Sequence, residues 1–313
     1  LLALPVSSLL ALFFSQAIVD PLKKMAVVTS QMTEGNYTVR TGIQKRDEVG
    51  MLANNVDVLA YRLEQASKAR AELEQLRKNY ISNISHELRT PVAVIRSSLE
   101  ALCDGIITQE EQVNSYYREM LAESIHLERL VNDLLELSRL QSPDYSIAKR
   151  NIDFAAVVED AVRSCRHIAE HAGHSIRLHK NFTGPIPFYG DFGRLRQMVV
   201  TVLDNAIKFS YPGEDIHVTM LRERNDCRIA VTNVGQGISE QELPHVFEEY
   251  YKQDSENNRT GTGLGLAIAK RIADRHNIVI SATSVPGAET TFSFELPVGF
   301  AEHPVQKACE SRL

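Results

Sequence analysis

Residues 85–91 read Ser-His-Glu-Leu-Arg-Thr-Pro and lie in a long run whose apolar residues recur every three or four positions, as in a helix. Ile84 and Leu88 are four apart and share one face of that helix, so His86 is turned toward solvent. Thr90 lies one turn after His86 on the same face. The stretch therefore predicts an exposed imidazole on a helix whose other face is buried.

The chemistry of this stretch centres on its imidazole. A neutral imidazole is nucleophilic and titrates near physiological pH, so His86 can attack a phosphorus centre. The carboxylate of Glu87 can hold the proton on the other ring nitrogen or take it up. Pro91 cannot donate a hydrogen bond to the carbonyl of Glu87, so we expect the helix to be weakened or bent at that turn. An isolated His-Glu pair is more often a plain surface feature.

The apolar spacing on both sides predicts a helical hairpin over residues 73–143. Its first arm ends near Asp104-Gly105 and its second arm ends near residue 141. The apolar positions of the two arms are Leu73, Leu76, Tyr80, Ile84, Leu88, Ile95, Leu99 and Leu102, then Val113, Tyr117, Met120, Leu127, Val131 and Leu134. Two such hairpins can bury these faces in a four-helix bundle, so we expect a homodimer.

Two shorter helices with heptad spacing are predicted upstream, in residues 20–72. Gly35 can supply the turn that ends the first helix. The apolar positions are Leu22, Met25, Thr29 and Met32 in the first helix, then Val49, Leu52, Val56, Leu59, Leu63 and Ala66 in the second. These stripes are too narrow for the helices to be stable alone, so they need partner helices. Between Ala66 and Leu76 the register shifts, which changes the local winding of a coiled coil.

The first 19 residues, Leu1 to Val19, contain no charged side chain and are long enough to cross a bilayer as a helix. They are followed by Asp20-Pro21-Leu22-Lys23-Lys24, whose lysines predict that this end faces the cytoplasm. We therefore expect residues 1–19 to be the last part of a membrane anchor. A buried core helix and a secretory apolar segment are the alternatives.

After residue 143 short β-like runs alternate with helical stretches. The expected strands are Ser175 to Leu178, Ile216 to Leu221, Arg228 to Thr232, Ile278 to Ala282 and Thr291 to Leu296, and the expected helices are Phe154 to Ala172, Phe192 to Phe209 and Leu264 to Arg275. This alternation predicts an α+β sandwich over residues 148–298, with helices on one face of a mixed sheet. Residues 299–313 form a C-terminal tail. The fold class is therefore multidomain.

The composition excludes several functions. A net charge of -6 over 313 residues gives no basic footprint for nucleic acid. The four cysteines include no Cys-x-x-Cys pair, which argues against a disulfide framework or a zinc site. His167 and His171 are spaced as metal ligands on a helix, but a polar helix end explains them more simply.

Three segments of the predicted sandwich carry residues suited to a nucleotide. Residues 204–209 end a helix, where Asn205 offers a carbonyl oxygen to a hard cation and Lys208 a charge to phosphate. Residues 233–237 (Asn-Val-Gly-Gln-Gly) follow a strand, and their glycines let the backbone approach a flat ligand. Residues 261–266 (Gly-Thr-Gly-Leu-Gly-Leu) precede a helix whose N–H groups can cradle phosphate. Each segment alone is weak evidence.

Taken in order, these segments resemble a sensor histidine kinase of a two-component system. Residues 85–91 match the H-box of that family. The segments that look like the N, G1, F and G2 boxes of the GHKL ATPase domain are 204–209, 233–237, 247–251 and 261–266. Residues 20–72 resemble a HAMP linker. This resemblance rests on Pro21, Glu34-Gly35-Asn36-Tyr37 and Asp47-Glu48-Val49-Gly50.

The resemblance implies autophosphorylation of His86 with ATP and Mg²⁺, and phosphotransfer to an aspartate of a response regulator. It gives Glu87 a role in proton transfer and Thr90 the role of positioning water for dephosphorylating the partner, which implies phosphatase activity as well. It also implies a bacterial inner-membrane protein with its HAMP, hairpin and ATP-binding domains in the cytoplasm. The implied nucleotide-binding residues are Asn205, Lys208, Phe209, Asn233, Gly235, Gly237, Lys252, Arg259, Gly261, Thr262, Gly263, Leu264, Gly265, Leu266 and Thr290, with Asn205 also the metal ligand.

Three residues depart from the family pattern. Asn233 stands where the family usually has an Asp that contacts the adenine amino group, although an amide carbonyl can still accept that hydrogen bond. Thr201 replaces a frequent second Asn, and Glu289 replaces a glycine. Two alternatives stay open: a degenerate nucleotide-binding scaffold or phosphatase-dominant sensor with weak kinase activity, and a GHKL ATPase that drives a clamp.

Overall fold

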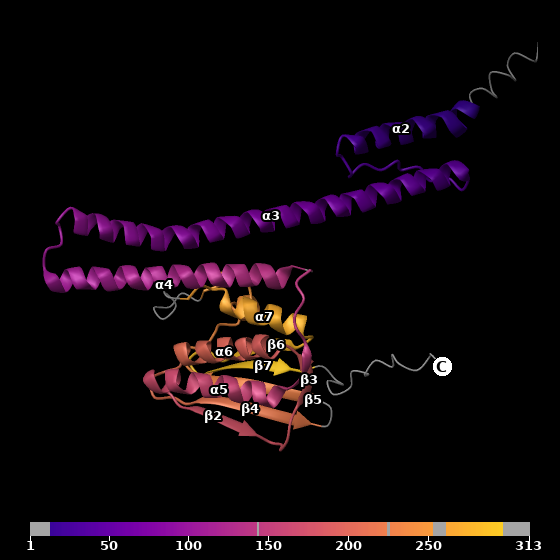
Figure 1. The fold of residues 1–313 in the computed structure, drawn as a ribbon. Coiled ribbons are helices and arrows are strands. Elements are labelled where there is room, and N and C mark those ends of the chain that lie inside the picture. Colours follow the sequence, from indigo (N-terminus) through magenta and orange to yellow (C-terminus); the bar gives the residue numbers. More distant parts are fainter. Residues whose placement is uncertain (1–12, 143, 224–225, 253–260, 297–313) are drawn as a thin grey trace, which may run out of the picture. The chain divides into compact units, whose positions relative to one another are not determined.

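The computed structural model describes residues 13–142, 144–223, 226–252 and 261–296. The chain divides into two compact units, Leu1–Glu87 and Leu88–Leu313. The boundary falls inside one long helix, α3 (Glu48–Cys103). Figure 1 labels most of the helices and strands.

The first unit consists of the π-helical turn η1 (Ser15–Val19), helix α2 (Asp20–Thr33) and the first part of α3. As predicted, α2 ends just before Gly35, which has a positive φ of 91°. Apolar side chains join α2 to α3. The buried members of this cluster are Val28, Met32 and Ala60, and Tyr37, Val39, Val56 and Leu63 pack around them.

The start of α3 is fixed by its preceding loop. The Asp47 carboxylate accepts the N–H of Gly50 at 2.8 Å, which satisfies a free donor at the helix start. A Cβ on Gly50 would lie 2.0 Å from the backbone oxygen of Lys45, so only glycine fits there. Further along, Thr41 is buried and bonds through its N–H and its hydroxyl to the Asp57 carboxylate, at 2.6 and 2.9 Å.

Helix α3 continues without interruption through the register shift at residues 66–76 and through Pro91. Pro91 is buried, and as a proline it removes one hydrogen bond from the helix.

Among the described residues, no helix combines the length and apolar character needed to span a membrane. Most of the predicted span, residues 1–12, lies outside the described residues.

The second unit is built around a five-stranded mixed sheet in the order β2-β4-β5-β7-β6. Only the β2–β4 pair is parallel; the other neighbours are antiparallel. The strands are β2 (Ile176–Lys180), β4 (Ile216–Glu223), β5 (Asp226–Val234), β6 (Val279–Ser284) and β7 (Glu289–Glu295). The predicted sandwich is confirmed, with strand ends shifted by a few residues.

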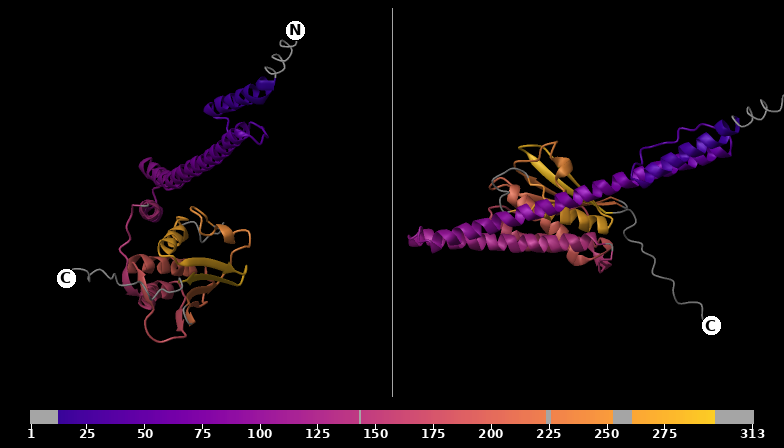
Figure 2. Two further views of the ribbon diagram at one scale, coloured as in Figure 1. Left: turned by 90° about the vertical axis from the view of Figure 1, so that its right-hand side faces the viewer. Right: turned by 90° about the horizontal axis from the view of Figure 1, so that it is seen from above.

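Helices α5 (Phe154–His171), α6 (Phe192–Phe209) and α7 (Gly265–Arg275) cover one face of the sheet (Figures 1 and 2). The N-termini of α5 and α6 are capped by Asp153 and Asp191, whose carboxylates accept backbone N–H groups at 3.0 and 3.1 Å. Their apolar faces and the inner face of the sheet form one core. This packing fixes the end of α6 and the start of α7, where two of the predicted motifs lie.

Two strands were not predicted, β1 (Arg150–Asp153) and β3 (Pro187–Gly190), which pair antiparallel as a separate ribbon. Each has four residues, which is too short for a clear alternating pattern. The loop between η2 (Leu243–His245) and α7 includes residues 253–260, outside the described part.

Helix α4 (Glu110–Gln141) follows α3 and contacts α7. Its buried side chains are Leu130, Leu137 and Leu140, which belong to the same core as the sheet and its helices. Of the predicted seam positions, Val131 is exposed in the single chain and Leu134 is partly buried against that core. Helix α4 thus has two apolar stripes, and the sequence pattern revealed only one of them.

Candidate nucleotide-binding site and phospho-acceptor helix

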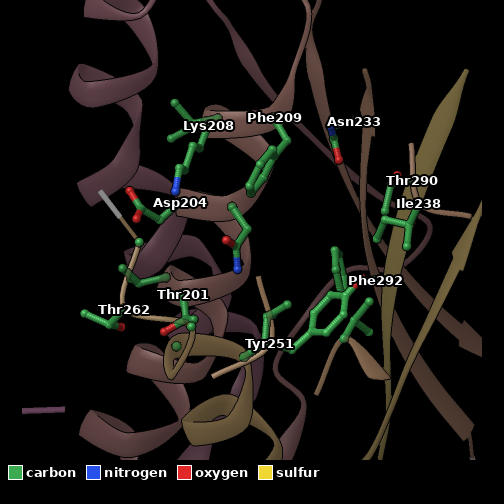
Figure 3. A pocket seen from close by; sticks show the side chains of 18 of the residues that line it. Thr201, Asp204, Lys208, Phe209, Asn233, Ile238, Tyr251, Thr262, Thr290 and Phe292 are labelled. Atoms are coloured by element: carbon green, nitrogen blue, oxygen red, sulfur yellow. The ribbon is translucent and has the colours of Figure 1, made fainter. Parts of the chain in front are cut away.

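A cavity of about 590 Å³ lies in the second unit, between the end of α6, the start of α7 and strands β5 and β7 (Figure 3). Its lining residues are Arg129, Asp133, Val200, Thr201, Asp204, Asn205, Ile207, Lys208, Phe209, Asn233, Gln236, Gly237, Ile238, Val246, Tyr251, Gly261, Thr262, Gly263, Gly265, Leu266, Thr290 and Phe292. Most of the predicted nucleotide-binding residues therefore gather around one hollow.

The last two turns of α6 form the polar wall of this cavity. Asn205 and Lys208 are three apart, and both line the cavity, where Figure 3 labels Lys208. The Lys208 ammonium lies 5.1 Å from the centre of the Phe209 ring. Burial lowers the pKa of Lys208, the nearby charges of Lys252 and Arg129 lower it further, and Asp204 opposes them. The cations Lys208 and Arg129 thus share this wall with the carboxylates Asp204 and Asp133.

The sheet supplies the opposite wall. Asn233 in β5 and Thr290 in β7 are paired across the two strands, and both are buried. The Thr290 hydroxyl shares a 2.7 Å hydrogen bond with Ser284. Ile238 and Phe292 lie on the same side and make this end of the cavity apolar (Figure 3). The cavity therefore has one end with charged side chains of both signs and one end suited to a flat, largely apolar group.

The two glycines after β5 have different functions. Gly237 has a φ of 73° and lines the cavity, and a Cβ there would lie 2.7 Å from the backbone of Val285 and Pro286. Gly235 does not line it. A Cβ on Gly235 would lie 2.0 Å from the backbone oxygen of Phe209, so this glycine lets the end of α6 approach β5.

The glycine-rich segment before α7 closes the cavity along one side. Gly261, Thr262, Gly263, Gly265 and Leu266 line it, and α7 begins at Gly265. Its first N–H groups are free of intrahelical partners, as in any helix. This arrangement suits phosphate oxygens.

Besides Gly235, two described residues of the predicted set do not line the cavity. Leu264 is fully buried in the core and does not line the cavity. Lys252 does not line it either, but its charge acts on Lys208. Arg259 lies outside the described residues.

Helix α4 contributes two lining residues that the motifs did not indicate, Arg129 and Asp133. The Thr262 hydroxyl donates a 2.7 Å hydrogen bond to the Asp133 carboxylate. Burial raises the pKa of Asp133, and Glu136 adds to this, while the bond from Thr262 opposes it. No sequence motif marks these positions, because they reach the cavity only through the docking of α4 on α7.

A second polar contact joins α4 to α6. The Glu136 carboxylate pairs with the Arg194 guanidinium and accepts a 2.8 Å hydrogen bond from the Gln197 side chain. The guanidinium also donates to the Tyr145 hydroxyl at 2.9 Å. These half-buried contacts orient the helix whose last turns form the polar wall.

His86, Glu87 and Thr90 lie on α3. His86 and Thr90 are exposed, as predicted, and Glu87 is half-buried. None of the three lines the cavity within the described residues. The structure therefore presents the candidate nucleophile on a helix and the nucleotide cavity in the α+β domain.

The side chains that line the cavity offer few ligands to a metal ion, so they fit only an ion that takes most of its ligands from a nucleotide and water. Within the described part of the chain, no three His, Cys, Asp or Glu side chains gather as a metal site. Asn205 offers one amide oxygen at the cavity wall. This fits Mg²⁺, which commonly takes one or two protein ligands together with phosphate oxygens and water.

Three family models match successive parts of the chain. The HAMP domain matches residues 13–65, the His Kinase A (phospho-acceptor) domain matches 76–143, and the histidine kinase-, DNA gyrase B-, and HSP90-like ATPase matches 190–299. Sensor protein SrrB of Staphylococcus aureus (strain N315) is 33% identical over 227 residues, which are 72% of this chain and 39% of SrrB. The chain therefore spans about two fifths of that relative.

Solved structures share the fold. Histidine kinase ThkA in complex with response regulator protein TrrA matches 78% of this chain and 68% of that chain, with a TM-score of 0.61 and 18% identity. Full-length ShkA in complex with AMPPNP matches 72% of this chain and 47% of that chain, with a TM-score of 0.53 and 24% identity. At these identities the likeness concerns the fold alone.

Proposed function

This chain belongs to the sensor histidine kinase family, and we propose from this that it transfers the γ-phosphoryl group of ATP to His86 and then to an aspartate of a response regulator. The observation that carries the proposal is the cavity itself. It combines a buried amide and apolar side chains at one end with charged side chains at the other, where Lys208 and Arg129 lie with the carboxylates Asp133 and Asp204. A nucleotide carrying Mg²⁺ on its phosphates has this same division into an apolar base and a charged part that attracts both cations and carboxylates.

In this proposal the adenine lies against the sheet, beside Asn233, Ile238 and Phe292. The triphosphate points to the start of α7, where the N–H groups of Gly265 and Leu266 and the charge of Lys208 meet it. The AMPPNP bound to ShkA, which shares the fold, supports this use of the domain. The rest of the proposed set is Phe209, Gly235, Gly237, Lys252, Arg259, Gly261, Thr262, Gly263, Leu264 and Thr290. Gly235 acts by letting α6 approach β5, and Leu264 by packing in the core.

Mg²⁺ would be held by the Asn205 amide oxygen and by nucleotide phosphates. When bound, it neutralises charge that develops on the phosphoryl oxygens.

The chain's own residues account for the phosphoryl transfer as follows. A neutral ring nitrogen of His86 attacks the γ-phosphorus, the bond from that phosphorus to the β,γ-bridging oxygen breaks, and ADP leaves with that electron pair. The ring then carries a proton on its other nitrogen, which Glu87 can hold or accept. The aspartate of the response regulator next attacks the same phosphorus, and the P–N bond breaks to restore His86. Thr90, one turn away, is proposed to position water for dephosphorylating the regulator.

Several exposed apolar side chains on α3 and α4 support a homodimer. Leu99, Leu121, Ile125 and Leu135 are 47 to 61% exposed in the single chain. Large exposed side chains of this kind need a covering surface, and a second copy of the hairpin supplies one. The TrrA bound to ThkA, which shares the fold, supports a response regulator as the other partner. The HAMP match and the uncharged residues 1–19 support anchoring in the bacterial cell membrane.

The proposal is tested by incubating the full chain with γ-labelled ATP beside a His86→Gln variant. The amide cannot be phosphorylated as an imidazole can, and the cavity residues are untouched. We expect label on the wild type, none on the variant, and equal ATP binding by both. Bound ATP without label on the wild type would favour the scaffold or phosphatase alternative.

A further inference from the structure

The ring of His276 joins α6 to α7 at the ends of these helices that do not line the cavity. His276 directly follows α7 and is only 3% exposed. Its Nδ1 lies 2.8 Å from the carbonyl oxygen of Ile272 in the last turn of α7. Its Nε2 accepts the N–H of Asp191, the N-cap of α6, at 3.0 Å. We call these two hydrogen bonds the His276 latch.

The two partners of the ring allow only one protonation state. A carbonyl oxygen only accepts, so Nδ1 must carry a proton, and a backbone N–H only donates, so Nε2 must carry none. The ring in the latch is therefore neutral. A proton added to Nε2 would face the N–H of Asp191, and the hydrogen bond that joins α7 to α6 would be lost.

The surroundings of the ring also disfavour a second proton. Burial lowers the pKa of His276 from its ordinary value of 6.5, the bond to Ile272 and the charge of Asp191 oppose this, and the charges of Lys149 and Arg275 add to it. The Lys149 ammonium donates to the Arg275 carbonyl at 2.5 Å, so it lies at the end of α7. A protonated His276 would therefore add a positive charge beside two cations.

The Phe188 ring of β3 lies on another side of the imidazole. The centres of the two rings are 6.4 Å apart. Phe188 carries no charge and cannot accept the added proton, so this side also favours the neutral form.

The latch is connected to the cavity through the two helices. Helix α6 begins beside the latch and lines the cavity from Val200 to its last residue, Phe209. Helix α7 lines the cavity with Gly265 and Leu266 and ends at the latch. We propose that His276 is an acid-sensitive latch, whose protonation separates the far ends of α6 and α7 and loosens the two helices that carry the nucleotide cavity. This rests on the proposed function only in naming the ligand of the cavity.

The direction of the pH effect follows from the neutral form being the one that fits. The latch is complete above pH 6.5, the ordinary value, and is lost as the pH falls from there through the lowered pKa of His276. In the released state at pH 5.5, about ten rings are protonated for each neutral one. Release should therefore be favoured about tenfold at pH 5.5 compared with pH 7.5.

Hydrogen exchange at backbone amides measures this release in the full chain. The peptides to follow are residues 190–196 and 270–278, and each rate is divided by that of an unprotected amide at the same pH. In the wild type we expect this ratio to rise about tenfold from pH 7.5 to pH 5.5. His276→Gln should change it by less than about twofold, because the amide oxygen can accept the N–H of Asp191 and takes up no proton.

His174→Gln is the matched control. His174 is also buried, at 6% exposed, and its Nδ1 lies 3.0 Å from the Glu214 carbonyl oxygen. This bond holds the loop after α5 to the segment before β4, away from the helix ends that His276 joins. We expect this variant to keep the wild-type rise in exchange at both peptides.

The coupling to the cavity is tested in the same assay with the ATP analogue AMPPNP. At pH 5.5, saturating AMPPNP should lower the exchange ratio of both peptides by at least about threefold, because a ligand that prefers the latched form shifts the population toward it. Unchanged exchange at both peptides with AMPPNP bound overturns the coupling. If AMPPNP does not bind, the proposed function fails, and the pH dependence of exchange still decides the latch.

Two results of the pH series overturn the inference. One is a rise of less than about twofold in the wild type, and the other is an equal rise in His276→Gln. If His276→Gln does not fold, nitrogen NMR of the wild-type ring decides. A proton on Nδ1 alone at pH 7.5 and titration below 6.5 support the latch, whereas a proton on Nε2 or titration at or above 6.5 overturns it.

Discussion

Replacing Thr262 by valine keeps the shape of the side chain and removes its hydroxyl, which joins α4 to the start of α7. That hydroxyl donates to the Asp133 carboxylate at 2.7 Å and accepts the N–H of Leu264 at 3.3 Å. Hydrogen bonds to charged groups contribute about 1.5–3 kcal/mol. Because Asp133 is only partly buried, water can replace part of the lost bond. We therefore expect the lower value, about 1.5 kcal/mol, or roughly tenfold in the equilibrium for undocking α4.

The assay is a double-mutant cycle read by hydrogen exchange at the backbone amides of the first turn of α7. The variants are Thr262→Val, Asp133→Ala and the pair, and the predicted coupling is about 1.5 kcal/mol. Thr201→Val is the control, because Thr201 lines the same cavity and its side chain has no hydrogen bond within the described residues. A coupling below about 0.3 kcal/mol, or an equal effect of the control, would refute the reasoning.

The same contact predicts a pH dependence. Burial raises the pKa of Asp133, so its ionised form is disfavoured when α4 is docked. The contribution of this group to docking is fully present below its ordinary pKa of 3.8 and is lost as pH rises through the raised value. In the wild type, hydrogen exchange at the amides of the first turn of α7 should therefore accelerate with pH more steeply than exchange of an unprotected amide does. Asp133→Asn should remove this additional acceleration. A pH profile unchanged by Asp133→Asn would contradict this prediction.

Three further predictions follow from backbone contacts and pKa shifts. Gly235→Ala should lower the free energy of unfolding by at least about 2 kcal/mol in a denaturant titration, because the new Cβ would meet the last carbonyl of α6. The control Gly193→Ala, which has room for a Cβ, should change this free energy by less than about 1 kcal/mol. Burial lowers the pKa of Lys208, so ATP affinity measured from pH 7 upward should fall as the pH passes through that lowered value. Lys208→Arg should flatten this fall, because arginine stays charged. An equal fall in both proteins would contradict the role of Lys208 in binding phosphate. Burial raises the pKa of Cys227 to about 11. A thiol reagent at pH 8 should therefore label the exposed Cys103 and leave Cys227 unmodified, as measured by mass spectrometry of the peptides. Equal labelling of the two cysteines would be inconsistent with the burial of Cys227.

The parts of the site that could be predicted from sequence are those whose functional residues lie close together within one helix or one loop. Asn205 and Lys208 share a helix face because they are three apart, whatever surrounds them. Residues 261–266 come directly before a predicted helix, where backbone N–H groups are open to phosphate. Except for Leu264, these residues line the cavity as expected.

The parts that could not be predicted depend on how distant segments pack. Asp133 reaches Thr262 across 129 positions of sequence, and nothing local distinguishes it from other acidic residues of a helix. The stripe of Leu130, Leu137 and Leu140 is interleaved with the apolar positions of the predicted seam, so periodicity cannot assign either stripe to a partner. The tertiary contact with α7 decides between them.

The phosphoryl group on the chain itself is the most direct test of the central claim. After incubation with ATP, the full chain is digested and the modified residue is located by mass spectrometry under neutral or basic conditions, which preserve a P–N bond. We predict one phosphorylated peptide, carrying the group on the His86 ring and losing it in acid. A phosphoryl group on another residue would contradict the account, as would inorganic phosphate released equally by the wild type and His86→Gln with no phosphorylated protein.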